Sequence, residues 1–373
     1  MPGTRSSGRG RTDGGIVKHA LPARRGWTRV VAATLLSALA LPAWAADACP
    51  RDTRLADYPP MVSLRVDNDL FAGRDEGYTS GVGLTLVSPN LRDYVDDPCL
   101  PATARLVNRY MEWLQPQGFE QQNMVVTVGQ GIFTPGDGTR RDLIVDDRPY
   151  AGALLVGFGY NARQDNRLRT TQLLVGMVGP ASLAEKTQRL IHKFTGSDNF
   201  EGWDHQLRNE PVLNLVHERL WRSEVRPIGG GSLQWDAISH AGGAVGNLNT
   251  HANTGLELRL GHRLPDDFGS SPVRPAGSNT APTRTGPALS GWSWNAYIAM
   301  DARWVLRDMT LDGNTFRSSH SVDREPLVGE AAVGFAVSRG RTRFALARYF
   351  RTREFKGQDE RPSYGSFTIT HAF

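Results

Sequence analysis

Residues 62–373 contain a series of short segments in which apolar and polar residues alternate. "LELRLGH" (256–262) and "RFALARYF" (343–350) alternate cleanly, whereas "AGALLVGFGY" (151–160) is rich in glycine and ambiguous. Alternating segments of about ten residues, separated by turn residues, are typical of an antiparallel transmembrane β-barrel, which in bacteria has an even number of strands. We predict an all-β fold, a barrel of twelve strands at 62–70, 79–88, 123–131, 151–161, 169–179, 209–222, 233–246, 254–263, 291–304, 325–338, 341–352 and 363–373.

Both ends of the chain are consistent with export to an outer membrane. Arg24, Arg25 and Arg29 precede the apolar run "VVAATLLSALAL", which is followed by the small-residue pattern "AWA". This run is too short to span a bilayer and fits a cleaved signal peptide. The last strand alternates up to a terminal Phe373, which resembles the assembly signal of outer-membrane barrels. We therefore expect a signal peptide at 1–45 that directs export through the Sec pathway, a periplasmic segment at 46–61 and an outer-membrane barrel at 62–373.

Charge and cysteine content narrow the function classes. Residues 1–45 carry a net charge of +6 and the whole chain +5, so the chain without its signal peptide has a net charge of −1. A nucleic-acid partner is therefore not expected. Cys49 and Cys99 would meet an oxidising compartment after export, and we expect them to form a disulfide.

Strand parity assigns the connections to the two sides of the membrane. If the N-terminus is periplasmic, the segments 89–122 and 264–290 are periplasmic as well. The first contains Cys99 and a predicted helix near "ATARLVNRYMEWLQ", and the second is rich in Pro, Ser, Gly and Thr and is typical of a linker. The outer connections are then 71–78, 132–150, 180–208, 247–253, 305–324 and 353–362.

Polar residues gather where the first two strands meet the outer rim. Asn68 and Asp69 end the first strand, and Thr79 and Ser80 begin the second. An Asn-Asp pair at a hairpin is also explained by turn chemistry. Amide and carboxylate oxygens are nevertheless suited to Ca²⁺, and a hydroxyl can ligate the ion, bind a substrate or attack it.

The third outer connection adds a helix with two polar residues on one face. "SLAEKTQRLIHKF" (182–194) is predicted to be helical, with Ser182 as N-cap and Glu185 completing a capping box. Gln188 and His192 are four residues apart and project from the same face, although a histidine on a loop helix can also be merely exposed. In the second outer connection, "DDRPY" (146–150) is either part of a site or a turn with an Arg–Asp pair.

These residue types fit ester hydrolysis better than other chemistries. Histidine titrates near neutral pH and can take a proton from water or a hydroxyl, so His192 is a candidate base that Gln188 would orient. Ca²⁺ held by Asn68 and Asp69 would polarise an ester carbonyl. The sequence contains no G-x-S-x-G, H-E-x-x-H or Walker motif.

At this point the motifs resemble a known family. "VDNDLF…YTSGVGL", "DDRPYAG", "GP…TQRLIHKF" and "GWDHQLRNEP" are similar to segments of the lipid A 3′-O-deacylases of Gram-negative outer membranes. The similarity runs from about residue 62 to the C-terminus and is strongest in 62–220. It implies a twelve-stranded barrel that removes the 3′-acyloxyacyl group of lipid A, with lipopolysaccharide in the outer leaflet as substrate, dependence on Ca²⁺ and an expected monomeric state.

The resemblance also implies roles for particular residues. The catalytic positions of the family fall on Asn68, Asp69, Thr79, Gln188 and His192. An acidic position after the histidine corresponds to Asp198, where a Glu can stand, and would contribute to the metal site. A basic position in the second outer connection corresponds to Arg140, where a Lys can stand. Asp198 and Arg140 are thus the two positions at which this sequence departs from the family's alternative residues.

Two alternative functions remain at this stage. An outer-membrane phospholipase A-like esterase would also be a Ca²⁺-dependent barrel, but it would need a serine nucleophile and a histidine on adjacent strands, and His192 is predicted on a loop helix. A non-catalytic barrel, either a narrow pore or a structural protein, would tolerate His192→Ala without loss of any activity.

Overall fold

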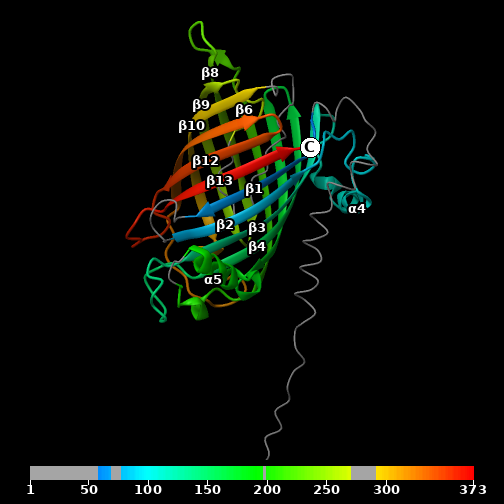
Figure 1. The fold of residues 1–373 in the computed structure, drawn as a ribbon. Coiled ribbons are helices and arrows are strands. Elements are labelled where there is room, and N and C mark those ends of the chain that lie inside the picture. The colour runs from blue at the N-terminus through cyan, green and yellow to red at the C-terminus, as the bar shows by residue number, and fades with distance from the viewer. Residues whose placement is uncertain (1–57, 69–76, 196–198, 270–290) are drawn as a thin grey trace, which may run out of the picture. The chain divides into compact units, whose positions relative to one another are not determined.

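The computed structural model describes residues 58–68, 77–195, 199–269 and 291–373, which lie within one compact unit, Ala45–Phe373. This unit is a β-barrel of long, tilted strands (Figure 1). Short helices lie in its connections: α4 (Ala102–Tyr110), η2 (Glu112–Leu114), η3 (Pro180–Ser182), α5 (Ala184–Thr195), η4 (Trp203–His205) and α6 (Met309–Asp312). The strands are β1 (Met61–Asn68), β2 (Gly77–Val87), β3 (Gln121–Thr134), β4 (Ala151–Gln164), β5 (Arg167–Val178), β6 (Glu210–Arg222), β7 (Arg226–Pro227), β8 (Leu233–Gly246), β9 (Asn249–His262), β10 (Trp292–Asp308), β11 (Leu327–Arg339), β12 (Thr342–Arg351) and β13 (Ser363–Ala372).

The sheet closes on itself with antiparallel pairing throughout. Neighbours follow chain order, and the ring is completed by the pairing of β1 with β13 and of β6 with β8. β7 is a two-residue extension that pairs with β8 beyond the ring. The predicted closed barrel of twelve strands is therefore confirmed, and its closure leaves no unpaired edge.

One predicted connection is wrong in its extent. β9 begins at Asn249, so the turn after β8 is 247–248 and not 247–253. His251 and Asn253 continue the ladder with β8, opposite Ala244 and Gly242. The polarity of His251 and Asn253 predicts a loop, but polar side chains are tolerated in a strand whose inner face lines a polar lumen.

Antiparallel order divides the connections between two ends of the barrel. The connections 69–76, 135–150, 179–209, 247–248, 309–326 and 352–362 share one end, which we call the α5 end. The connections 88–120, 165–166, 223–232, 263–291 and 340–341 share the other, the α4 end. Figure 1 shows α5 at the lower end and α4 beside the upper part of the wall.

Residues along each strand alternate between an apolar outer face and a polar lumen. On β6, Leu213 and Trp221 are exposed, whereas Glu218 and Arg222 are buried. Because side chains alternate with period two, buried charges and exposed apolar residues mark the two faces directly. This is the inverse of a water-soluble protein and suits a barrel whose outside contacts lipid.

Side chains fill the lumen at the α5 end. Met309 and Leu311 of α6 are buried, and Met309 joins an apolar cluster with Phe133 and Leu174 from the wall. A cavity of about 100 Å³ remains beside this cluster.

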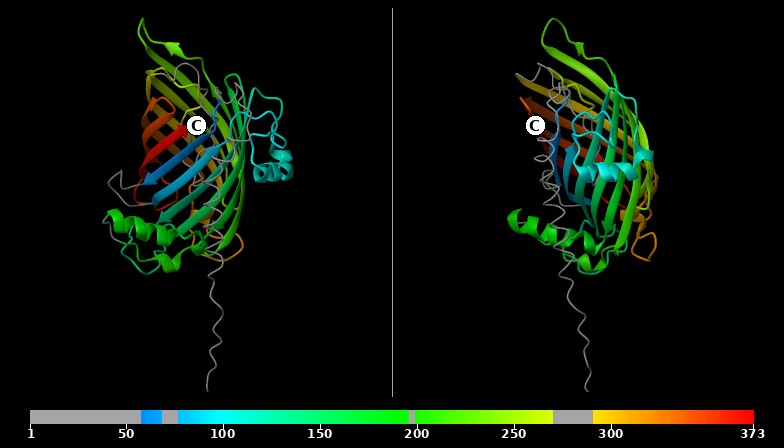
Figure 2. Two further views of the ribbon diagram at one scale, coloured as in Figure 1. Left: turned by 45° about the vertical axis from the view of Figure 1, so that its right-hand side comes forward. Right: turned by 90° about the vertical axis from the view of Figure 1, so that its right-hand side faces the viewer.

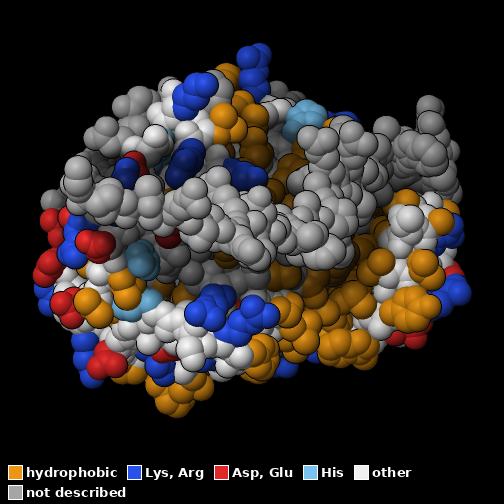
Figure 3. Space-filling view, turned by 90° about the horizontal axis from the view of Figure 1, so that it is seen from below, with side chains coloured by type: hydrophobic (Ala, Val, Ile, Leu, Met, Phe, Trp, Pro, Cys, Tyr) orange, Lys and Arg blue, Asp and Glu red, His pale blue; other side chains and the backbone are white. Residues whose placement is uncertain are grey.

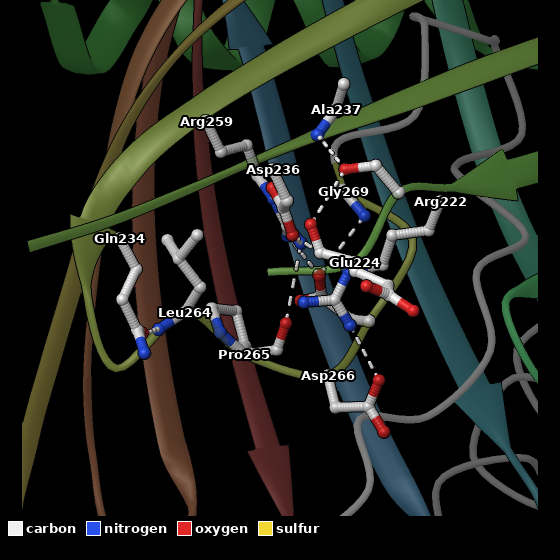
Figure 4. A network of polar contacts seen from close by, with 12 residues as sticks. Arg222, Glu224, Gln234, Asp236, Ala237, Arg259, Leu264, Pro265, Asp266 and Gly269 are labelled. Carbon is white, nitrogen blue, oxygen red and sulfur yellow. Dashed lines mark hydrogen bonds and ion pairs between the residues drawn. The ribbon is translucent and has the colours of Figure 1, made fainter. Parts of the chain in front are cut away.

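A network of ion pairs fills the lumen toward the α4 end (Figure 4). Asp236 of β8 accepts hydrogen bonds from Arg222 at 2.8 Å and from Arg259 at 2.7 and 2.8 Å. Asp267, in the connection after β9, pairs with Arg259 and with Arg343. Buried charges are tolerated when each has a partner, so this connection is tied into the barrel where it leaves the wall.

The helices lie outside the wall or in the connections. No helix within the described ranges is long and apolar enough to cross a membrane. Figure 2 shows α4 crossing the outer surface of the strands and α5 against the opposite end of the barrel. Cys99, just before α4, is disulfide-bonded, while Cys49 lies outside the described residues, as do the predicted signal peptide and most of the 46–61 segment.

Candidate active site

Helix α5 buries the stripe of residues that carries both predicted polar groups. Ala184, Gln188 and His192 follow at intervals of four, and all three are buried, with Gln188 2% and His192 3% exposed. The predicted helix is thus confirmed, and so is the prediction that Gln188 and His192 share a face. That face is turned toward the protein.

The predicted capping box is wrong. Ser182 belongs to η3, and Leu183, at φ 62°, turns the chain between η3 and α5. The Ser182 hydroxyl accepts a hydrogen bond from the Ala184 N–H at 3.4 Å, but its own N–H donates to Gly179 O. Glu185 instead pairs with Arg189 at 2.9 Å. Because the η3 turn includes Ser182, α5 begins at Ala184, two residues after the predicted start. The spacing of Ser182 and Glu185 in the sequence does not indicate this turn.

A row of paired residues runs across four strands on the outer face at this end. Asn68 lies opposite Ser80, Ser80 opposite Ile132, and Ile132 opposite Gly152. The row belongs to the outer face because Leu64, four residues before Asn68, is 40% exposed there. Asn68 and Ser80, two residues of the polar hairpin predicted at the rim, therefore lie on the lipid-facing side of the wall.

Helix α5 is seated on this row. Ile132 and Ala184 share an apolar cluster, and a Cβ added to Gly152 would collide with Ala184 Cβ and Ser182 Oγ. Gln130 Nε2, two residues before Ile132, donates to Ser182 O at 2.5 Å. The missing side chain at Gly152 is what allows the start of the helix to touch the strands.

The orientation of the Gln188 amide is fixed by an indole. Trp203 Nε1–H donates to Gln188 Oε1 at 2.8 Å. An indole nitrogen can only donate, so the amide oxygen must face Trp203 and the NH₂ must face away. Gln188 Nε2 is buried and has no hydrogen-bond partner among the described residues. A buried donor without a partner is costly, which makes it a candidate for binding a ligand or a water.

Aromatic rings surround the two polar groups. The His192 ring lies edge-on to Phe200 at 5.7 Å between centroids, and Tyr150 contacts both Phe200 and Trp203 at 6.3 and 5.1 Å. Burial raises the pKa of Tyr150 to about 12, so its hydroxyl keeps its proton at neutral pH. The rings hold the helix and the 199–209 segment against the wall and exclude water from around His192.

The second connection at this end joins the same cluster. Glu201 N–H donates to Gly138 O at 2.9 Å, and Gly138 leaves room for the Phe200 ring. Arg140 follows two residues later, and its side chain is exposed. The structure thus brings the loop that carries Arg140 beside the residues that pack on His192.

"DDRPY" proves to be largely structural. Arg148 is 1% exposed and projects into the lumen, where it donates to Glu354 Oε2 at 3.1 Å and Thr310 Oγ1 at 3.2 Å. Its guanidinium does not form the Arg–Asp pair considered from the sequence: Asp147 accepts from the N–H of Gly136 at 2.8 Å and from the backbone N–H of Arg148 at 2.6 Å. Two residues on, Tyr150 packs on the outer side, so the motif joins the two faces of the wall.

Thr79 occupies an irregular position on β2. Tyr78 lies opposite Phe133 and Ser80 opposite Ile132, so Thr79 is the additional residue of a β-bulge. Bulges occur where a strand must change the direction of its side chains, often next to active sites. Ser80 is buried on the outer face. The alternation that predicts faces elsewhere does not assign one to Thr79.

The predicted Ca²⁺ ligands are described in part. Asn68 is half-buried at the end of β1, whereas Asp69 and Asp198 lie outside the described residues. No group of three His, Cys, Asp or Glu side chains arranged to hold a metal occurs in the part of the chain that the structure describes. The chemistry of the predicted set, one amide and two carboxylates, fits Ca²⁺, which prefers oxygen ligands.

Sequence reasoning missed the residues that position the site. Trp203, Tyr150, Phe200 and Gln130 were not singled out, although Trp203 lies within the quoted "GWDHQLRNEP" motif. The sequence feature that could have identified Trp203 is its position in an otherwise polar connection, because a tryptophan there usually packs against other apolar side chains.

The fold and the position of the site define a class. A closed antiparallel barrel with an apolar outside and a charged inside is the architecture of an outer-membrane barrel protein, and here Gln188 and His192 are buried on a helix whose start packs on the outer wall. A family model described as "Outer membrane protein LpxR" matches residues 30–373. The chain belongs to the LpxR family of outer membrane proteins, which confirms the family resemblance predicted from the motifs.

A solved structure of an LpxR protein has the same fold. LpxR from Salmonella typhimurium superposes with a TM-score of 0.64 at 17% identity, covering 84% of this chain and 100% of that one. The β domain of the Bordetella autotransporter BrkA gives 0.41 at 10% identity, with 85% and 100% covered. No curated protein sequence matches the chain.

Proposed function

We propose that the protein is a lipid A 3′-O-deacylase, which hydrolyses the ester that joins the 3′-acyloxyacyl chain to lipid A. The observation that carries the proposal is the placement of Gln188 and His192. Both are buried on the face of α5 that starts with Ala184, and Ala184 contacts Ile132 and Gly152 of the outer wall, so an ester would reach them from the lipid side. Membership of the LpxR family supports an outer-membrane enzyme that acts on lipid A.

The surroundings suit an anionic lipid. The wall beside the row offers exposed Leu64 and Val82, against which acyl chains can lie. The other face of α5 presents Lys186, Arg189 and Lys193 to solvent. Figure 3, seen from the α5 end, shows Lys and Arg side chains next to hydrophobic ones. Cations beside an apolar wall match the phosphate groups and acyl chains of lipid A.

The chemistry follows from one base and a positioned water. Neutral His192 would take a proton from the water while its oxygen attacks the ester carbonyl. The acyl–oxygen bond then breaks, and the proton passes to the departing 3′ oxygen of the sugar. Gln188 Nε2 would hold the water or the ring. The products are a free 3′ hydroxyl and an acyloxyacyl carboxylic acid.

The remaining predicted residues would stabilise charge around the carbonyl. Asn68, Asp69 and Asp198 would hold Ca²⁺, which when bound supplies positive charge for the developing oxyanion. Thr79 would bind the ion or the substrate through its hydroxyl, and Arg140 would neutralise negative charge on the open side. Export by the Sec pathway and action as a monomer are part of the same proposal.

The two alternative functions make different predictions: a phospholipase would act on another substrate, and a pore would have an open lumen. A phospholipase would release fatty acid from glycerophospholipids with the same base. A pore needs an open lumen, and the buried Met309 and Leu311 argue against one.

The test is deacylation of lipid A by the purified protein in detergent, followed by mass spectrometry. We expect loss of the 3′-acyloxyacyl mass in the presence of Ca²⁺ and its retention in chelator. His192→Ala should lower the rate by about 10²–10⁴-fold, the usual contribution of a general base. His205→Ala is the matched control, since His205 is exposed in the same connection and should leave the rate unchanged.

Three outcomes would contradict the proposal. Full activity of folded His192→Ala protein would remove the base, and full activity in chelator would remove the ion. Release of fatty acid from glycerophospholipid without change in lipid A would favour the phospholipase.

A further inference from the structure

Helix α4 and the η2 turn expose a stripe of large apolar side chains at the other end of the barrel. Leu106 and Tyr110 are 57% and 78% exposed, and Trp113 on η2 is 69% exposed. Leu106 and Tyr110 are four residues apart on α4 and therefore share a face, and Trp113 follows on the η2 turn directly after the helix. Singly exposed apolar residues are common, but an exposed stripe that ends in Tyr and Trp indicates a contact surface.

The opposite side of this segment is fixed to the outer wall of the barrel. Tyr160 of β4 donates to Asn108 Oδ1 at 2.7 Å, and Asn108 Nδ2 donates to Tyr94 O at 2.6 Å. The Tyr94 and Tyr160 rings meet edge to face at 5.1 Å. Tyr160 of β4 is opposite Met124 of β3. Met124 shares the outer face of β3 with the partly buried Val126, two residues later. Tyr160 therefore lies on the outer face as well. The helix therefore covers wall residues that would otherwise face lipid.

The α4 end of the barrel wall has the features of a membrane interface. Trp221, Trp235, Trp292 and Trp294 are exposed on the strands at the same end. Tryptophan and tyrosine concentrate at the level of lipid headgroups, where an apolar ring and a polar N–H or O–H are both satisfied. Figure 2 shows α4 lying across the strands and not along them, which is the orientation of a helix in the plane of a membrane surface.

We propose that the Leu106–Tyr110–Trp113 stripe inserts into the headgroup region of the phospholipid leaflet at the α4 end. Arg105 and Arg109 lie on α4 beside the stripe, where they can meet lipid phosphates. Continuity with the lipid-facing wall favours lipid over a protein partner. The segment thus anchors the barrel at one interface, and this inference does not depend on the proposed function.

The experiment measures which surroundings Trp113 has in a bilayer. Wild-type protein and Trp113→Phe are reconstituted in vesicles of phosphatidylethanolamine and phosphatidylglycerol. Part of the lipid carries bromine, which quenches tryptophan on contact, near either the headgroup end or the methyl end of its chains. Because the chain has nine tryptophans, the emission of Trp113 is taken as the wild-type signal minus that of the variant. Trp294→Phe serves as the lipid-exposed reference and Trp203→Phe as the buried one.

The expected result is loss of the Trp113 emission with bromine near the headgroups, and a weaker loss with bromine near the methyl ends. Tyr110→Glu should reduce the lipid quenching of Trp113 and raise its quenching by soluble iodide. Emission that iodide quenches and brominated lipid does not would place the stripe in water and overturn the proposal. If neither reagent quenches Trp113 and chemical cross-linking gives dimers, the stripe contacts a second copy of the protein. This result would also overturn the proposal.

Discussion

At the scale of single residues, the geometry of the site depends on which hydrogen bonds each polar atom can donate or accept. The indole of Trp203 uses the oxygen of Gln188, and this fixes where the amide donors lie. His192 is held by a ring edge of Phe200 and by its place on α5. Neither constraint is visible in the spacing of Gln188 and His192, which establishes only that both share a face.

Gln188 provides a prediction at this scale. Gln188→Met keeps the length of the side chain and removes its amide donors. We expect kcat for lipid A deacylation to fall by about 10²-fold, the cost of losing one positioned donor, with a smaller change in KM. Trp203→Phe should cause a smaller loss, because it removes the bond that orients the amide and leaves the donors in place. Equal kcat for wild type and Gln188→Met would show that the unpaired amide is structural, and Thr187→Ala is the control on the same helix.

The residues of the β1–β2 hairpin provide a second prediction. Asp69→Ala should lose activity through weaker Ca²⁺ binding and recover part of it at high Ca²⁺, because a lost carboxylate lowers the affinity of the site. Thr79→Ser should retain activity if the hydroxyl binds the ion or the substrate, and Ser80→Ala should matter less than Thr79→Ala. The measurement is deacylation rate against Ca²⁺ concentration; a rate of Asp69→Ala that does not respond to Ca²⁺ contradicts the ligand assignment.

At the scale of elements, the decisive contact is that of α5 with the strands. The helix begins where Gly152 lets Ala184 and Ser182 approach β4. A helix of twelve residues is marginal in isolation and depends on such packing for its position. The positions of Gln188 and His192 therefore depend on the contact between the start of α5 and β4.

Gly152→Ala tests that contact. The new methyl group would push the start of α5 from the wall, and a displacement of about 1 Å can cost on the order of 10²-fold in rate. The barrel should still fold, as judged by heat-modifiable migration on a gel. Gly329→Ala is the control at the same end, because its Cβ would meet Thr352 Cγ2 at an ordinary 3.4 Å. Unchanged activity of Gly152→Ala would separate the site from the seating of the helix.

At the scale of the whole molecule, the barrel is stabilised by paired charges inside an apolar exterior. Arg351 donates to Glu330 at 2.9 and 2.5 Å and to Glu354 at 2.8 Å. Glu354 in turn receives Arg148 from the connection before β4. The network joins strands that are far apart in the sequence, and it fills the space that a channel would leave open.

Arg351→Ala should therefore destabilise the barrel. Two buried carboxylates lose their main partner, which typically costs about 3–5 kcal/mol. The midpoint of the heat-modifiable gel shift should fall accordingly. Arg353→Ala, at an exposed position two residues on, should change the free energy of unfolding by less than about 0.5 kcal/mol. Equal midpoints for the two variants would mean that the network adds little to stability.

Much of the fold could be predicted from the sequence because the signal is local. Alternation of period two states which residues face lipid and which face the lumen, and closure by an even number of strands assigns every connection to an end. The α5 helix was equally readable, since residues four apart must share a face. Local patterns failed where polar residues stay in a strand, as at His251 and Asn253, and where η3 precedes a helix.

For polar groups in the connections, tertiary structure alone decided on which side of the wall each one lies. "DDRPY" suggested a rim site, yet Arg148 enters the lumen to meet Glu354, 206 residues away in sequence, while Tyr150 packs outside. The sequence placed Gln188 on a helix but could not show that Trp203 would take its oxygen. Such contacts join segments that are distant in the sequence, and no periodic pattern of residues predicts which distant segments meet. They form because closure of the barrel brings distant strands together, and the bulge at Thr79 and the bare surface of Gly152 then determine what fits against the wall.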